Sequence, residues 1–131
     1  MWTFEQISGR LYDSDGKLEG IGYSGFANGK NNPDAQSIHQ VGPIPCGLYS
    51  MQAPHDSQTH GPFVIPLIPN PENEMFGRDG FLIHGDSKHA PGTASLGCII
   101  QARDVREKVW NSGDHVLQVV ARLAEVKPWP V

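Results

Sequence analysis

The residues best placed to do chemistry are a histidine and a cysteine in the segment FLIHGDSKHAPGTASLGCII, residues 81–100. An apolar stretch precedes His84, and Cys98 follows Gly97 and precedes another apolar pair. A neighbouring histidine either takes the thiol proton or stabilises the thiolate, and this pair is the minimum required for nucleophilic acyl transfer. Gly97 would leave its backbone open to a substrate, and the amides of Gly97 and Cys98 would face a developing oxyanion. The segment therefore predicts a cysteine nucleophile with a histidine base.

Each of these residues also has a purely structural interpretation. A buried cysteine is often a small, inert hydrophobic residue, and His84 alone would fit a hydrogen-bonded core histidine. The sequence Ser95-Leu-Gly-Cys98 with a histidine upstream favours catalysis. Cys46, between a proline and a glycine, lacks such neighbours and is interpreted as structural, although a disulfide between the two cysteines stays open.

A metal site is a second alternative for the same segment. His84, Asp86 and His89 form a short string of zinc-ligand types, to which Cys98 would add a thiolate. A thiolate bound to zinc is not a free nucleophile, so this interpretation and the catalytic one exclude each other. We favour the free nucleophile, and we expect no metal and no other cofactor.

The composition indicates what kind of fold positions these residues. The chain has 131 residues, and its 15 glycines and 11 prolines make up about a fifth of them, against a norm of ~12%. This argues for many turns and short strands and against a helical bundle. The length allows one domain, so we expect residues 1–131 to form a single unit.

Residue patterns predict the individual elements. Asp15-Gly16 favours a hairpin turn, and Val105 and Val109 have helical spacing over 104–111, with Gly113 as a stop. Pro66 predicts an edge strand or a bulged strand at 63–68. The remaining strands are expected at 2–9, up to about 23–24, 47–52, 81–83 and 116–123, with loops at 25–40, 54–61, 69–79 and 87–93. The expected fold is mostly β, a sandwich or barrel with one or two short helices.

Charge and hydropathy exclude two classes of function. The 10 Lys and Arg residues are scattered, and 14 Asp and Glu residues give a net charge of −4, so nucleic-acid binding is not expected. No apolar run approaches the ~18–20 residues that span a bilayer, so we expect no membrane insertion. The N-terminal residues lack a basic start followed by an apolar stretch. Export, if it occurs, is therefore expected to use a route other than a standard secretory signal.

The histidine, the spacer and the Ser-x-Gly-Cys sequence resemble the catalytic signature of the L,D-transpeptidases (YkuD-like enzymes). Several other stretches are similar to small type VI secretion effectors with L,D-transpeptidase-like activity. These stretches are WTFEQ at 2–6, GYSG at 22–25, GKNNP at 29–33, GPIPCGLY at 42–49 and GRDGFLIHGD at 77–86. The resemblance covers essentially the whole chain and implies a β-rich L,D-transpeptidase-like fold.

The resemblance also implies a reaction. Cys98 would attack the carbonyl between the third and fourth residues of a peptidoglycan tetrapeptide stem, and D-Ala would leave a thioester behind. Water would then give carboxypeptidase activity, whereas an amine would give D-amino acid exchange or a cross-link. His84 would be the base, oriented by a backbone carbonyl or by Asp86. Support for the loop and the oxyanion would come from Gly85, Asp86, Ser95 and Gly97.

Two positions depart from the family pattern. Many transpeptidases have a histidine where this chain has Leu96 and an arginine where it has Ile100, so no role is transferred to those two side chains. Arg78 and Arg103 are candidates for binding a stem carboxylate, although either would also fit a solvated surface arginine. Tyr23 is a candidate substrate contact or a rim aromatic.

The implied biology is that of an antibacterial toxin. The protein would be secreted without a Sec signal and would act as a monomer in the periplasm of a target bacterium. Its partners would be peptidoglycan stem peptides, an immunity protein and a component of the type VI delivery apparatus. A module that binds the cell wall but has lost turnover is the non-enzymatic alternative.

Overall fold

A computed structural model describes residues 1–123, which are mostly β-structure with one α-helix and two short 3-10 helices. Within this part of the chain no helix has the length and apolarity needed to cross a membrane. The elements are β1 (Trp2–Glu5), β2 (Arg10–Tyr12), β3 (Leu18–Ile21), β4 (Tyr23–Ser24), η1 (Ala27–Gly29), η2 (Pro33–Ala35), β5 (Gly47–Met51), β6 (His55–Ser57), β7 (Gly61–Pro69), β8 (Leu82–His84), β9 (Ile99–Ile100), α1 (Arg103–Asn111) and β10 (Val116–Val120).

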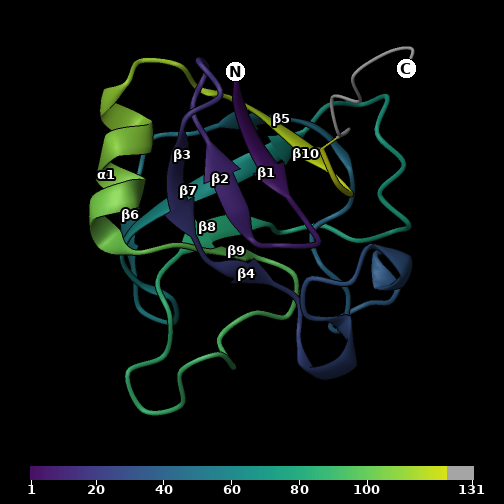
Figure 1. The fold of residues 1–131 in the computed structure, drawn as a ribbon. Helices are drawn as coiled ribbons and strands as arrows, with labels where there is room; N and C mark the ends of the chain where they lie inside the picture. Colours follow the sequence, from purple (N-terminus) through teal and green to yellow (C-terminus); the bar gives the residue numbers. More distant parts are fainter. Residues whose placement is uncertain (124–131) are drawn as a thin grey trace.

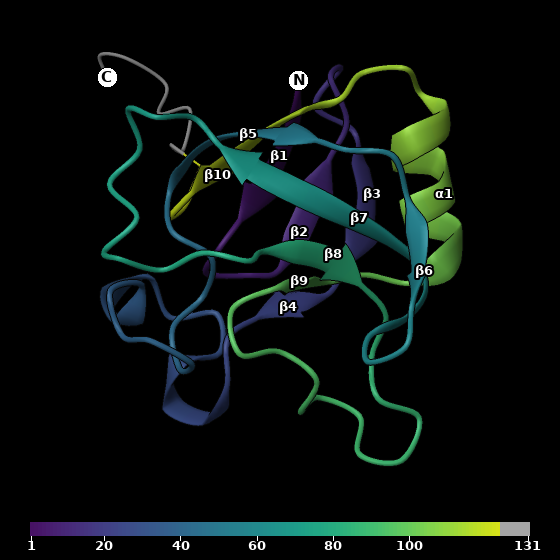
Figure 2. The ribbon, with the colours of Figure 1, turned by 180° about the vertical axis from the view of Figure 1, so that it is seen from behind.

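The strands form one curled sheet in the order β3-β2-β1-β10-β5-β7-β8-β9-β4, with β6 paired to β7 (Figures 1 and 2). The two ends of this order, β3 and β4, are neighbours in the chain, separated by Gly22 alone. The Gly22 amide donates to the carbonyl of Gly9 at 2.8 Å. A Cβ on Gly22 would overlap the carbonyl oxygen of Ile100. The sheet therefore closes on itself at Gly22, where only a residue without a side chain fits. The predicted mostly β fold is confirmed.

The inside of the curled sheet is apolar. Phe4 on β1 lies between its register partners Leu11 on β2 and Val119 on β10, and all three side chains are buried. Ile83 and Ile99, which are register partners on β8 and β9, are fully buried in the same core. Ile83, just before His84, and Ile99, just after Cys98, therefore hold β8 and β9 in the core by hydrophobic burial.

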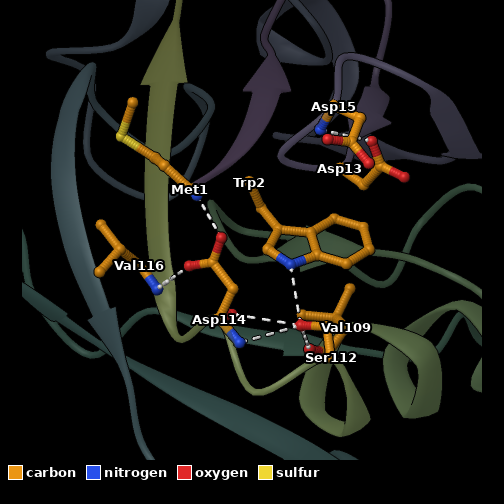
Figure 3. Close-up of polar contacts among 8 residues, drawn as sticks. All are labelled: Met1, Trp2, Asp13, Asp15, Val109, Ser112, Asp114 and Val116. Carbon is orange, nitrogen blue, oxygen red and sulfur yellow. Dashed lines mark hydrogen bonds and ion pairs between the residues drawn. The ribbon is translucent and has the colours of Figure 1, made fainter.

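Helix α1 covers one side of the sheet and is tied at its C-terminal end to β1 (Figure 3). The indole Nε1 of Trp2 donates to the hydroxyl of Ser112 at 3.2 Å. That hydroxyl donates in turn to the carbonyl of Val109 at 2.6 Å and accepts from the amide of Asp114. Asp114 also contacts the amino group of Met1. These bonds satisfy groups at the helix end that would otherwise lack partners.

Several predicted elements are confirmed with small changes of boundary. The helix begins one residue earlier than the predicted 104–111, and the last strand ends at Val120 rather than at residue 123. The predicted turn joins β2 to β3, where the carboxylate of Asp13 accepts from the amides of Asp15 and Lys17. The predicted strand at 2–9 is limited to Trp2–Glu5, because the chain turns back before β2.

One prediction about residues 54–69 is wrong, and of the two alternatives given for the strand at 63–68 the edge strand is the one that fails. Strand β6 occupies part of the expected loop, because His55 pairs with Val64 on the neighbouring strand. Strand β7 is not at an edge, since it pairs with β5 and β8. Pro66 is tolerated there because it lies opposite the end of β5, where its carbonyl accepts from the amide of Gln52 at 2.9 Å. A bulge was the better expectation: Phe63 has a φ of +55°, and the β6–β7 register shifts.

Closure of the sheet at Gly22 can be tested by adding one methyl group. Gly22→Ala is expected to lower the free energy of unfolding by more than about 3 kcal/mol, because the methyl meets backbone that cannot move aside. Gly16→Ala is the control, because the φ of Gly16 is +81° but nothing lies near the added methyl. This substitution should lower the free energy of unfolding only by the strain of the left-handed conformation, about 1–2 kcal/mol. Urea denaturation measures both. Equal losses would contradict a closed sheet.

Candidate functional site

The pairing of strands β8 and β9 brings together the two segments that carry the histidine and the cysteine. The two strands run parallel, with Ile83 opposite Ile99 and His84 opposite Ile100. Cys98 lies in the bend immediately before β9, and His84 is the last residue of β8. The Sγ of Cys98 is 4.0 Å from the carbonyl oxygen of Gly80, and within residues 1–123 no hydrogen bond joins it to His84.

Two hollows lie beside these residues. The larger is a groove of about 1410 Å³ lined by His84, Tyr23, Asp86 and Arg103 among others. The smaller, of about 300 Å³, is lined by Cys98 and its neighbours in space. His60 lines both hollows. The thiol and the imidazole are therefore reached from adjoining spaces that share one residue.

The surroundings of His84 favour the neutral form of its imidazole ring. Its side chain is buried, and Nδ1 donates to the carbonyl of Gly85 at 2.8 Å. A carbonyl only accepts, so the proton of the neutral ring is on Nδ1 and the lone pair is on Nε2. Burial lowers the pKa of His84, which keeps the ring unprotonated at neutral pH. Of the two orienting groups expected from the sequence, the backbone carbonyl makes the contact.

Asp86 instead organises the loop that follows His84. Its carboxylate accepts from the Tyr23 hydroxyl at 2.6 Å and from the amides of Ser87 and Gly92. Burial acts to raise the pKa of Asp86, but these hydrogen bonds lower it overall. Burial and the bond to Asp86 raise the pKa of Tyr23 to about 12, and the Tyr23 hydroxyl also accepts from the amide of Ala94. Tyr23 and Asp86 therefore hold both ends of the loop 86–94, which lines one wall of the groove.

The turn that carries Cys98 is held by two buried hydroxyl groups. Ser95 Oγ accepts from the amides of Gly25 at 2.9 Å and Gly97 at 3.0 Å, and it donates to the carbonyl of Cys98 at 2.6 Å. Ser24 Oγ donates to the carbonyl of Gly97 at 2.8 Å. Loop support by Ser95 therefore fits the geometry. The Gly97 amide points at Ser95, so the expectation that it faces an oxyanion is wrong.

Arg78 lies beside Cys98, but its guanidinium is occupied by backbone. Nη1 donates to the carbonyls of Gln36 at 2.6 Å and Pro43 at 2.7 Å. Nη2 donates to the carbonyls of Gly42 at 2.9 Å and Leu96 at 3.2 Å. The side chain is buried, and burial lowers its pKa. This geometry ties the segment before β5 to the cysteine turn, and it does not fit the expected role of Arg78 in binding a substrate carboxylate.

The electrostatics of Cys98 favour a thiol over a thiolate. Burial raises its pKa, and the opposing influence of the Leu82 amide and the Arg78 charge does not compensate. A thiol that is protonated at neutral pH becomes a nucleophile only when a base takes its proton, so the surroundings of Cys98 do not favour a preformed thiolate–imidazolium pair. Cys46 and Cys98 are both free, so the disulfide left open by the sequence does not form.

Arg103 has the freedom that Arg78 lacks. It is the first residue of α1 and lines the groove, with its side chain about half exposed. Its guanidinium lies 5.2 Å from the ring centre of Phe63 and 3.5 Å from the carboxylate of Glu107. Such a surface contact with Glu107 contributes little stability, which leaves the arginine available to an incoming carboxylate.

The zinc alternative is not supported by the arrangement of side chains. No three His, Cys, Asp or Glu side chains of residues 1–123 converge on a common point. The carboxylate of Asp86 is committed to Tyr23 and to backbone amides. The string His84, Asp86 and His89 is therefore close in sequence without forming a metal-binding cluster.

His60 is a member of the site that sequence reasoning missed. It lies in the turn between β6 and β7, and its ring centre is 4.8 Å from that of His84. The segment 54–61 was expected to be a loop, and its sequence carries no local sign of proximity to residue 84. Only the antiparallel pairing of β6 and β7 and of β7 and β8 brings it there.

A family model described as the Tlde1 domain matches residues 19–124. The chain belongs to the Tlde1 domain family. Membership makes this Tlde1 domain a type VI secretion effector, which confirms that part of the resemblance seen in the sequence. The matched region contains both His84 and Cys98. No curated protein and no solved structure matches the chain.

The two arginines of this Tlde1 domain are expected to respond differently to replacement. Arg78→Lys removes the planar fork that donates to four carbonyls, so it should lower the free energy of unfolding by about 2–4 kcal/mol. Arg103→Lys, the matched control at a half-exposed position, should change it by less than about 0.5 kcal/mol. Thermal unfolding of both variants measures the difference. A stable Arg78→Lys variant would show that the guanidinium does not hold the cysteine turn.

Proposed function

We propose that this Tlde1 domain is a peptidoglycan L,D-carboxypeptidase and L,D-transpeptidase with Cys98 as nucleophile and His84 as base. The observation that supports the proposal is the parallel β8–β9 pairing, which brings the strand that ends in His84 beside the strand that follows Cys98, next to two hollows that share His60. The free Nε2 of a neutral His84 and the protonated thiol of Cys98 are the complementary states that base-assisted attack requires.

In the proposed reaction, His84 Nε2 accepts the Cys98 proton as sulfur bonds to the carbonyl carbon between the third and fourth stem residues. The resulting tetrahedral intermediate collapses as the C–N bond breaks, and His84 returns the proton to the leaving nitrogen of D-Ala. A thioester remains. Water or the amine of a D-amino acid or a second stem then attacks it, giving a proton to His84, and the thiolate leaves and is reprotonated.

The groove suits an extended, anionic peptide. Its volume of about 1410 Å³ exceeds what a single amino acid needs, and its lining includes the cationic side chains Lys88 and Arg103. Stem peptides carry free carboxylates, and a guanidinium binds a carboxylate through two parallel hydrogen bonds. We assign this contact to Arg103, with Tyr23 as part of the rigid wall beside it.

The proposed setting follows from the substrate. Peptidoglycan stems are accessible in the periplasm, so a type VI effector with this chemistry would act as a toxin in that compartment of a target cell. Self-protection would require an immunity protein that blocks the groove, and delivery would require a partner in the secretion apparatus. Both partners fit the effector family to which the chain belongs.

The decisive experiment removes the sulfur of Cys98. Cys98→Ala should abolish D-Ala release from purified tetrapeptide muropeptides, read by mass spectrometry, and should abolish toxicity when the domain is directed to the periplasm. Cys46→Ala is the matched control, because Cys46 is the other half-buried free thiol and lies outside both hollows; it should retain activity. Retained toxicity of Cys98→Ala would instead favour a cell-wall-binding module without turnover.

The pH dependence of the reaction follows from the lowered pKa of His84. Activity requires the neutral ring, so it persists as the pH falls to 6.5 and is lost only below that value, as the ring becomes protonated. A pH profile of kcat/KM for D-Ala release should therefore have its acidic limb below pH 6.5, the ordinary pKa of histidine. A limb above pH 6.5 would be inconsistent with a buried, neutral His84 as the base.

A further inference from the structure

We propose that His60 is a positioning residue for His84, holding the base imidazole in the orientation from which it reaches Cys98. The inference rests on the proposed function and adds a residue to its machinery. The first observation is contact: the two imidazole rings lie 4.8 Å apart between centres, tilted by 55°. The second is location, since His60 lines both the groove beside His84 and the hollow beside Cys98.

His84 needs a second contact because its hydrogen bond to Gly85 restrains only one atom of the ring. The bond from Nδ1 to the carbonyl of Gly85 fixes one ring nitrogen but leaves the tilt of the ring free. The tilted ring of His60, in contact with the ring of His84, supplies the missing restraint. His84 is 3% exposed although it borders a groove, and the exposed ring of His60 is part of what shields it from water.

The turn that carries His60 is itself anchored from two directions. Ser57 Oγ accepts from the amides of Thr59 at 3.3 Å and His60 at 3.0 Å. Arg106, which is buried on α1, donates to the carbonyls of Pro62 at 3.1 Å and Phe63 at 3.0 Å, just after His60. The side chain of His60 is also bonded, through Nδ1, to the hydroxyl of Thr59 at 2.9 Å. The ring is therefore held where it can act as a support.

His60 also lowers the pKa of His84. The groups that act on His84 are His60 from the β6–β7 turn, Arg106 from α1, and Asp86 and the carbonyl of Gly85 from the segment after β8. Burial lowers the pKa of His84 most, the Gly85 carbonyl opposes this, and the charge of His60 lowers it further. Removing His60 takes away both a like charge and a water shield. Both changes raise the pKa of His84, so the acidic limb of activity moves to higher pH.

The test compares His60→Ala with His60→Phe, which keeps a ring against His84, and with His55→Ala. His55 is an exposed histidine on neighbouring β6 that lines neither hollow. His60→Ala should lower kcat for D-Ala release by about 10- to 100-fold with little change in KM, and should raise the His84 pKa measured by NMR titration. His60→Phe should recover most of kcat, and His55→Ala should behave as wild type. Thermal unfolding confirms that each variant is folded.

The outcomes separate this inference from the function on which it rests. Unchanged His84 titration and kcat in His60→Ala would overturn the positioning role, and so would a His60→Phe variant as impaired as His60→Ala. A wild-type domain that releases no D-Ala would refute the proposed reaction. A raised His84 pKa in His60→Ala would even then support the contact between the two rings, because the titration requires no substrate.

Discussion

The parallel pairing of β8 with β9 is the constraint on which the candidate site depends. Each strand is short, and the pairing is set by Ile83 and Ile99, which are buried partners in the core. A shift of one residue would turn Ile99 out of the core and would also displace the turn that carries Cys98 relative to His84. Burial of these two isoleucines therefore determines how the segments that carry His84 and Cys98 lie beside each other.

Buried polar side chains hold the loops around this pairing in place, as the apolar core holds the strands. Arg78 binds four carbonyls near the cysteine turn, and Arg106 binds carbonyls beside the turn of His60. Ser24 and Ser95 brace the cysteine turn from within. A chain rich in glycine and proline has many backbone groups outside regular pairing, and these side chains satisfy them. The loops near the site are consequently ordered by directional bonds that only particular side chains can make.

The sequence predicts the local parts of this arrangement well. Helical spacing located α1, Asp15-Gly16 located a turn, and the apolar run before His84 located β8. Properties that arise from pairing between distant segments were missed: β6 in a supposed loop, the interior position of β7 despite Pro66, and His60 against His84. Arg78 shows the same limit, because no local pattern distinguishes an arginine that binds substrate from one that binds backbone.

The region matched by the Tlde1 domain begins at residue 19, inside β3, whereas β1 and β2 precede it. These two strands fill the sheet between β10 and β3 and contribute Trp2, Phe4 and Leu11 to the core. A fragment trimmed to the matched region would leave the edge of β10 without its partner and uncover apolar side chains. Unpaired strand edges beside exposed hydrophobic surface recruit other chains. Recombinant fragments that start at the family boundary would therefore aggregate, and the N-terminal hairpin belongs in any soluble preparation.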